Sequence, residues 1–177
     1  AAPKATKLPA DASARVKLLG HPNGWVRDTA QRLLVEACDA KAAGPLAALL
    51  ADPKSPAVTR LHALWTLDGL GAAKPEAVRL ALKDADAQVR AAAVRLAPAE
   101  MLPDLCALKT ETDTLVLAHL AIRLSAANVP DSDKALAEVL AAHGDNALVR
   151  EVALTGARGR EVALAQAVAA LGSAANL

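Results

Sequence analysis

Aromatic residues are almost missing from this chain of 177 residues. Phe and Tyr are absent, and Trp25 and Trp65 are the two tryptophans. Strands favour aromatic and β-branched side chains, whereas Ala and Leu rank highest for helix propensity. Hydrophobic residues make up 54% of the chain, mostly as Ala, Leu and Val. The composition therefore predicts an all-α protein that is long enough to bury a sizeable core.

An excess of charge of one sign is also missing. The chain has 20 basic and 19 acidic residues, for a formal net charge of +1. Charge-driven binding to nucleic acids or to anionic membranes requires a clear excess of Lys and Arg. No apolar run approaches the roughly 20 residues of a membrane span. We therefore expect neither a nucleic-acid partner nor insertion into a membrane.

Cysteine and the usual signatures of chemical sites are scarce as well. Cys38 and Cys106 cannot form a disulfide framework, and we expect both to be small buried apolar residues. The four histidines do not pair with Cys or carboxylates at metal-ligand spacing, and the Cys-x-x-Cys-His of covalent haem is absent. We therefore predict no catalytic, metal or cofactor-binding residue, and a chain that is not an enzyme.

What the chain does contain is an Ala that recurs at nearly constant spacing in helical segments. Neighbouring members lie 33, 30, 28 and 32 residues apart. The five positions are Ala30, Ala63, Ala93, Ala121 and Ala153. Such a period is typical of helical repeats, in which each unit is one helical hairpin that buries its apolar face by stacking on its neighbours.

This period predicts the organisation of the chain. We expect about five helical hairpins plus one extra, eleventh helix. Residues 1–10 are predicted to be a linker and residues 11–177 a single repeat domain, as a segment of a longer protein. Because uncapped repeat arrays expose their terminal apolar faces, self-association through the ends is also expected.

An Arg column accompanies the Ala column. Three residues before each Ala stand Arg27, Arg60, Arg90, Ala118 and Arg150. At about 100° per residue this column lies beside the core stripe, so its guanidinium groups should be half covered. We predict hydrogen bonds from these Arg residues to Asp side chains or to carbonyl groups, as a polar ladder. The alternative is ordinary solvated charge, worth ~0–1 kcal/mol per pair.

The face of the second helices opposite the core is the predicted partner-binding surface. Trp65 occupies a position that other repeats give to Arg, and Leu61 lies one helical turn earlier. The candidate partner-binding residues are Arg32, Leu61, Trp65, Arg95 and Arg123. Trp and Arg are enriched in the energetic centres of protein interfaces. The other interpretation is that Trp65 folds sideways across Ala91 or Ala92, and both interpretations stay open. Trp25 is expected to pack at the rim.

Three segments carry a resemblance to a known family. Residues 84–96 (DADAQVRAAAVRL) resemble a HEAT repeat. Residues 21–36 and 60–71 are similar to the HEAT region of large bacterial proteins described as membrane-bound dehydrogenases with haem-binding domains. The close match spans roughly residues 12 to 97. In that family a β-propeller dehydrogenase domain comes first, HEAT repeats follow, and a c-type cytochrome domain comes last.

The resemblance implies a right-handed α–α superhelix that serves as a spacer between the propeller and the cytochrome, in the periplasm or cell envelope. The resulting hypothesis is a non-catalytic HEAT-repeat scaffold that binds a protein or the neighbouring domains of its own chain. The alternative is a helical-repeat enzyme or prosthetic-group handler, lyase-like or acting on nucleic acid, with a site on the concave face.

Overall fold

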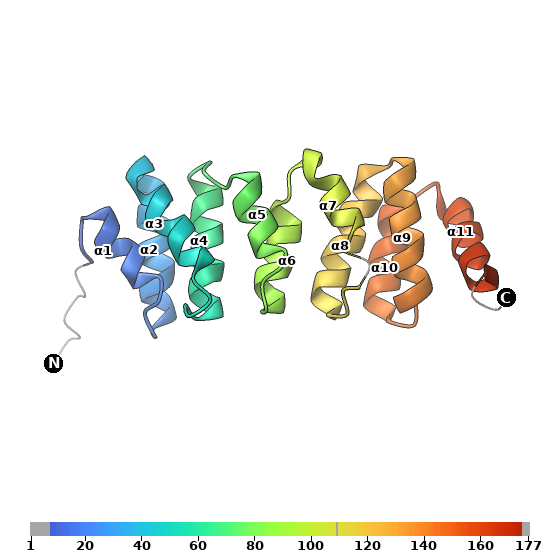
Figure 1. Ribbon diagram of the computed structural model, residues 1–177, viewed down its shortest axis with the longest axis horizontal. Coiled ribbons are helices and arrows are strands. Elements are labelled where there is room, and N and C mark those ends of the chain that lie inside the picture. The colour runs from blue at the N-terminus through green and yellow to red at the C-terminus, as the bar shows by residue number, and fades with distance from the viewer. Residues whose placement is uncertain (1–7, 109, 175–177) are drawn as a thin grey trace. The chain divides into compact units, whose positions relative to one another are not determined.

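The computed structural model describes residues 8–108 and 110–174 (Figure 1). The described residues form eleven α-helices and two short 3₁₀ segments, and none of them lies in a strand. The all-α prediction and the number of helices are thus confirmed. The chain divides into two compact units between Ala92 and Ala93, inside one helix.

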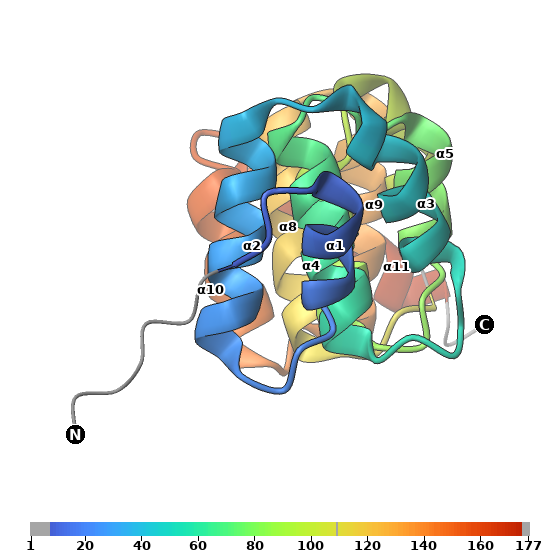
Figure 2. The ribbon, with the colours of Figure 1, turned by 90° about the vertical axis from the view of Figure 1, so that its left-hand side faces the viewer.

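Unit 1 is built from helical pairs in two layers. Its helices are α1 (Ala12–Leu18), α2 (Gly24–Ala37), α3 (Ala43–Ala51), α4 (Ala57–Gly69), α5 (Pro75–Ala81) and the first part of α6 (Ala87–Leu96). A 3₁₀ turn at Ala40–Ala42 precedes α3. Helix α1 packs on α2 and α3 packs on α4. The first helices α1, α3 and α5 also contact one another in order, as do the second helices α2 and α4 (Figure 2).

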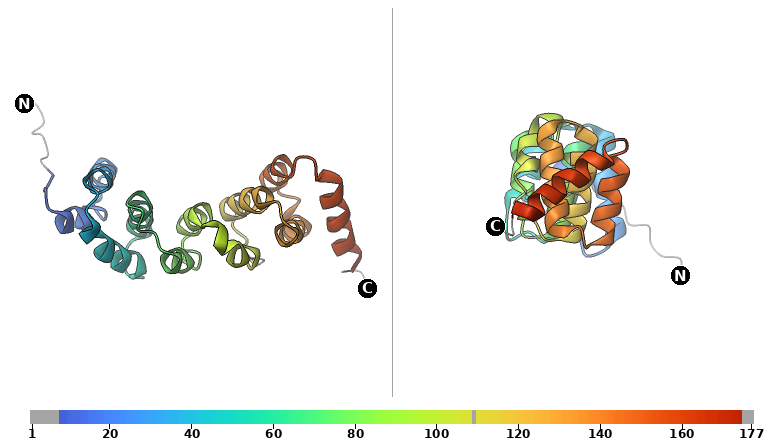
Figure 3. Two further views of the ribbon diagram at one scale, coloured as in Figure 1. Left: turned by 90° about the horizontal axis from the view of Figure 1, so that it is seen from above. Right: turned by 90° about the vertical axis from the view of Figure 1, so that its right-hand side faces the viewer.

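Unit 2 repeats this arrangement from Ala93 onward. Its helices are the end of α6, α7 (Leu102–Cys106), α8 (Thr114–Ala127), α9 (Pro130–His143), α10 (Ala147–Gly156) and α11 (Glu161–Ala174). A 3₁₀ turn at Ala99–Met101 precedes α7. The second helices α8 and α10 pack on each other, and α9 contacts both of them. Helix α11, red in the right-hand view of Figure 3, packs on α9.

The recurring Ala lies at the centre of each second helix and is fully buried. All five members of the column have 0% exposure, in α2, α4, α6, α8 and α10. The residue four positions before each of them is buried too: Val26, Thr59, Val89, Leu117 and Val149. Both columns therefore face the core, as the helical spacing predicts.

The starts of the second helices share a polar cap. The side chains of Asn23, Asp113 and Asn146 accept hydrogen bonds from backbone N–H groups in the first turns of α2, α8 and α10. Asp86 does the same at the start of α6. These bonds satisfy N–H groups that a helix leaves without an internal partner. Helix α4 begins differently. Its N-cap residue is Pro56, and no side-chain hydrogen bond caps this helix within the described part of the chain.

Several local signals in the sequence do not match the structure. Ser before Pro is a common helix start, but the N-cap of α4 is Pro56 and not Ser55. Gly often follows a helix end, but α11 continues through Gly172. Val162 is apolar but lies exposed in the first turn of α11. Short helices and chain ends leave positions uncovered that periodicity alone assigns to the core.

Both cysteines also differ from the prediction of buried apolar residues. Cys38 is exposed, and Cys106 is half-buried. Cys38 is the C-cap of α2 and adopts a left-handed backbone conformation with φ of 48°. A helix commonly ends with one residue in this conformation, so Cys38 stands where the chain turns away from the core.

Gly156 marks a close approach between α8 and α10. A Cβ atom added at Gly156 would overlap both Cβ and Oγ of Ser125 on α8. Ser125 is itself buried, and its hydroxyl donates to the carbonyl of Ile122. Rotation of the hydroxyl cannot relieve an overlap with Cβ, so the two helices approach closely because residue 156 has no side chain.

We expect Gly156→Ala to lower the free energy of unfolding by roughly 1–3 kcal/mol, because overfilling a packed contact forces backbone shifts. Gly44→Ala is the matched control, since a Cβ there meets no described atom within 4 Å. Its effect should be zero or stabilising, because Ala has the higher helix propensity. Urea unfolding followed by circular dichroism measures both, and equal effects would contradict the close approach.

Candidate functional site

The Arg residues of the column donate hydrogen bonds to backbone carbonyl groups, as predicted. Most of these carbonyl groups lie in the loop just before the helix that carries the Arg. In three repeats the Arg Nη1 donates to the carbonyl six residues earlier. The pairs are Arg27 with His21 at 2.8 Å, Arg90 with Asp84 at 2.9 Å and Arg150 with Gly144 at 2.7 Å. Each guanidinium thus ties the start of a second helix to the end of the first helix before it. This role is structural.

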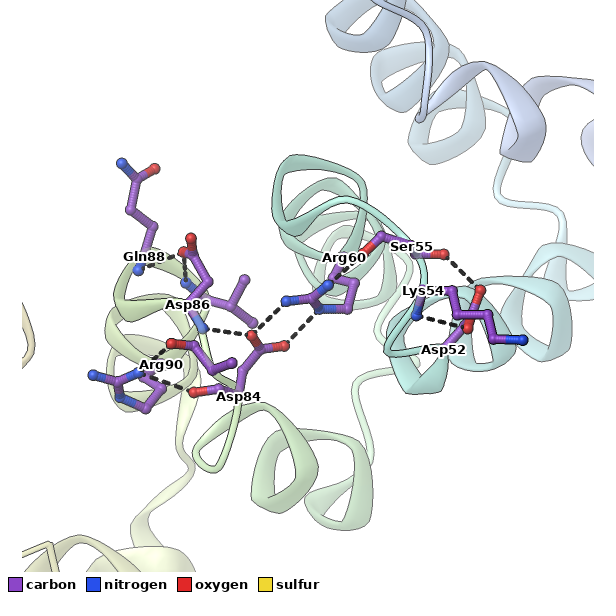
Figure 4. A network of polar contacts seen from close by, with 10 residues as sticks. Asp52, Lys54, Ser55, Arg60, Asp84, Asp86, Gln88 and Arg90 are labelled. Carbon is purple, nitrogen blue, oxygen red and sulfur yellow. Dashed lines mark hydrogen bonds and ion pairs between the residues drawn. The ribbon is translucent and has the colours of Figure 1, made fainter.

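Arg60 forms a different contact, because it reaches into the following repeat. Its Nε donates to Asp84 Oδ2 at 2.7 Å, and its Nη2 donates to Asp84 Oδ1 at 2.6 Å (Figure 4). Its Nη1 donates to the carbonyl of Ser55. Only 10% of the Arg60 side chain and 9% of the Asp84 side chain is exposed. The result is a bidentate, nearly buried ion pair between α4 and the loop after α5.

Both members of this pair are held in their charged forms. Burial on its own raises the pKa of Asp84, but the hydrogen bonds from Arg60 and from the Asp86 backbone lower that pKa below its ordinary value. The hydrogen bond to Asp84 outweighs burial and raises the pKa of Arg60. A carboxylate with a lowered pKa stabilises the fold above its unfolded pKa, and this contribution is lost as the pH falls through the folded pKa.

A second polar cluster joins α2 to α4 around His62. The Nε of Arg27 donates to His62 Nε2 at 3.3 Å, and His62 Nδ1 lies 2.7 Å from Gln31 Oε1. Asp28 Oδ1 lies 3.9 Å from His62 Nε2. Burial, followed by the positive charge of Arg27, lowers the pKa of His62, and Asp28 opposes this shift. This cluster was not expected from the sequence, since Gln31 and His62 are 31 residues apart.

Three of the predicted partner-binding residues lie in unit 1. Arg32 on α2 is exposed and forms an ion pair with Glu36 at 2.8 Å. Leu61 and Trp65 lie one turn apart on α4, and both are half-buried. Because α2 and α4 pack side by side, these residues come from neighbouring elements of one layer. Trp25, which we expected to pack at the rim, is instead 58% exposed at the start of α2.

The other two predicted residues lie in unit 2. Arg95 on α6 is exposed. Arg123 on α8 donates from Nη2 to the carbonyl of Ala97 at 2.6 Å, and within the described part of the chain its buried Nε has no hydrogen-bond partner. Arg123 therefore bonds to the chain just after α6.

An apolar groove between α8 and α10 was not predicted. It has a volume of about 490 Å³, and Ile122 and Val152 are among the residues that line it. Leu115 and Leu148, also on these helices, are exposed. Leu115 and Ile122 share one face of α8, and Leu148 and Val152 share one face of α10, by helical spacing. In the sequence, the more regular columns of buried residues on the same two helices conceal this spacing.

The described residues contain neither a metal-binding cluster nor a membrane-spanning helix. Within residues 8–108 and 110–174, no group of three or more His, Cys, Asp or Glu side chains is arranged to hold a metal ion. Over the same part of the chain, no helix combines the length and the apolar character that crossing a bilayer requires.

Comparison with known proteins gives no match to a family model, a curated protein or a solved structure.

We expect Asp84→Ala to lower the free energy of unfolding by roughly 3–5 kcal/mol, because it leaves the Arg60 guanidinium buried without its partner. Glu36→Ala is the matched control. It breaks an ion pair whose side chains are 60% and 54% exposed, so its cost should be about 0–1 kcal/mol. Urea denaturation at neutral pH measures both losses, and similar small values would show that the Arg60–Asp84 pair is not structural.

Proposed function

We propose that this chain is a non-catalytic scaffold of the HEAT-repeat kind, which holds protein partners or neighbouring domains in position. The observation that supports this proposal is the complete burial of the five recurring Ala residues at the same place in successive second helices. A fold assembled from equivalent hairpins presents a row of second helices, and repeat proteins commonly bind partners on such surfaces.

The distribution of polar side chains supports the same proposal. Arg27, Arg60, Arg90 and Arg150 bond to loop carbonyls or to Asp84. Arg123 bonds to the end of α6. These hydrogen bonds join helices to loops and to one another, and they engage the guanidinium groups within the fold. The Arg column thus forms contacts within the fold, as predicted, and is not ordinary solvated charge.

The docking surface we propose in unit 1 consists of Arg32, Leu61 and Trp65 on α2 and α4. Leu61 and Trp65 are half-buried, so their side chains are already held in place, and a partner would cover the remaining surface at little cost in side-chain entropy. Arg32 is exposed on α2, the helix that packs beside α4. Trp and Arg are enriched among the residues that contribute most of the binding energy at protein interfaces.

The resemblance supplies the context of the proposal. A HEAT segment of that kind separates a propeller dehydrogenase domain from a c-type cytochrome domain. The partners we propose are therefore these two domains of the same polypeptide, in the periplasm or cell envelope. The right-handed superhelical arrangement of the repeats belongs to this proposal as well.

The docking surface can be tested with Trp65→Ala and with Trp25→Ala as control. Binding of the chain to a propeller domain and to a cytochrome domain from the family it resembles is measured by titration calorimetry. We expect Trp65→Ala to weaken binding by at least tenfold, and Trp25→Ala to leave it unchanged. Thermal unfolding of both variants shows whether the fold is retained.

Two outcomes would contradict the proposed function. One is the absence of binding to either domain at high concentration, which leaves a spacer that contacts nothing. The other is a large loss of thermal stability in Trp65→Ala with unchanged binding, which would identify Trp65 as a packing residue.

A further inference from the structure

The contacts of the His62 ring imply one tautomer of its neutral form. An arginine Nε–H can only donate, so the His62 Nε2 that lies 3.3 Å from Arg27 Nε must accept. The proton of the neutral ring then lies on Nδ1, which donates to Gln31 Oε1 at 2.7 Å. One imidazole thus joins two side chains of α2 to α4, and each bond uses a different ring nitrogen.

Protonation of the ring is incompatible with one of these two bonds. In the imidazolium both nitrogens carry hydrogen, so Nε2–H would face the Arg27 Nε–H, with a positive charge on each side. The Arg27 guanidinium cannot simply withdraw, because its Nη1 donates to the carbonyls of His21 and Pro22 at 2.8 and 3.0 Å. The bond to Gln31 is unaffected, since Nδ1 donates in both states.

An alternative partner for the protonated ring is already in place. Asp28 Oδ1 lies 3.9 Å from Nε2, and its side chain is 74% exposed, so it can rotate toward the ring. Among the described residues, Arg27 and Asp28 are the charged groups that act on the pKa of His62. Helix α3 carries no ionisable side chain, and Glu76 and Arg79 of α5 do not contribute.

We propose that His62 is a proton-operated link between α2 and α4, in which protonation replaces the Arg27–His62 hydrogen bond with a His62–Asp28 ion pair. Only a proton is exchanged, taken up from solvent at Nε2. Helices α2 and α4 also carry Arg32, Leu61 and Trp65, so the exchange changes the contact between the two helices that present the docking surface. This last consequence rests on the proposed function, whereas the link itself does not.

The link has a direct spectroscopic test that needs no binding partner. Long-range ¹H–¹⁵N NMR of the full chain, labelled at histidine, reports which ring nitrogen carries hydrogen. At about pH 8 we expect His62 to carry its proton on Nδ1, the minor tautomer of free neutral histidine, and His62→Gln identifies its signals. Protonation at Nε2 under these conditions would overturn the proposal.

Titration of the same sample tests the exchange of partners. The Arg27 Nε–H signal should shift with the same midpoint as the His62 ring. Because the Asp28 carboxylate raises the His62 pKa, Asp28→Asn should move that midpoint to lower pH. The matched control is Asp68→Asn, an exposed carboxylate on α4 that does not act on His62. Equal midpoints in the two variants would overturn the role of Asp28.

The indole N–H of Trp65 reports on the docking surface in the same titration. A pH-dependent shift with the His62 midpoint, absent in His62→Gln, is the expected result. A Trp65 signal that does not follow His62 would overturn the connection to this surface. Failure of the binding experiment would leave the titration result intact, so the two proposals can fail separately.

Stability should follow pH in a defined direction. The pKa of His62 is lowered in the folded state. Near the ordinary histidine pKa, the folded chain therefore binds fewer protons at His62 than the unfolded chain does. The free energy of unfolding should therefore fall as the pH drops below about 6.5, the ordinary histidine value. His119 has a lowered pKa through burial and Arg95, so the part due to His62 is the difference between the parent chain and His62→Gln.

Discussion

The close approach of neighbouring helices at small residues is the constraint on which the rest of this structure depends. Ala30, Ala63, Ala93, Ala121 and Ala153 are fully buried at the centres of the second helices, and Gly156 lies directly against Ser125. A larger side chain at such a contact would separate two packed helices. With few aromatic residues available, the core is filled mainly by Ala, Val and Leu side chains, and each helical pair must pack closely to exclude water.

Close packing of short hairpins brings many helix ends and loops together, and their backbone groups need partners. Asn and Asp side chains satisfy N–H groups at the starts of four second helices, and the Arg column satisfies carbonyls of the preceding loops. Helix α4 lacks the polar cap, and its Arg60 donates both to the carbonyl of Ser55 and to the buried carboxylate of Asp84.

Much of the fold could be predicted because its signals are local and periodic. The Ala column and the carbonyl contacts of the Arg column follow from spacing along one helix. The candidate site was predictable only in part. Leu61 was expected on the outward face, and Trp65 either there or folded across Ala91 or Ala92. Both are half-buried, and Arg123 bonds to Ala97. Which face of a helix remains open depends on how far its neighbours extend, and one helix does not encode that distance.

The sequence by itself determined that the chain is helical, which face of each second helix is buried, and where the Arg column stands, because helical geometry converts residue spacing into direction. Only the tertiary structure decided which residues separated along the chain become partners. The Arg60–Asp84 pair and the Arg27–His62–Gln31 cluster join residues 24 to 35 positions apart. Such contacts depend on the distance and rotation between helices, which arise from packing all the side chains together.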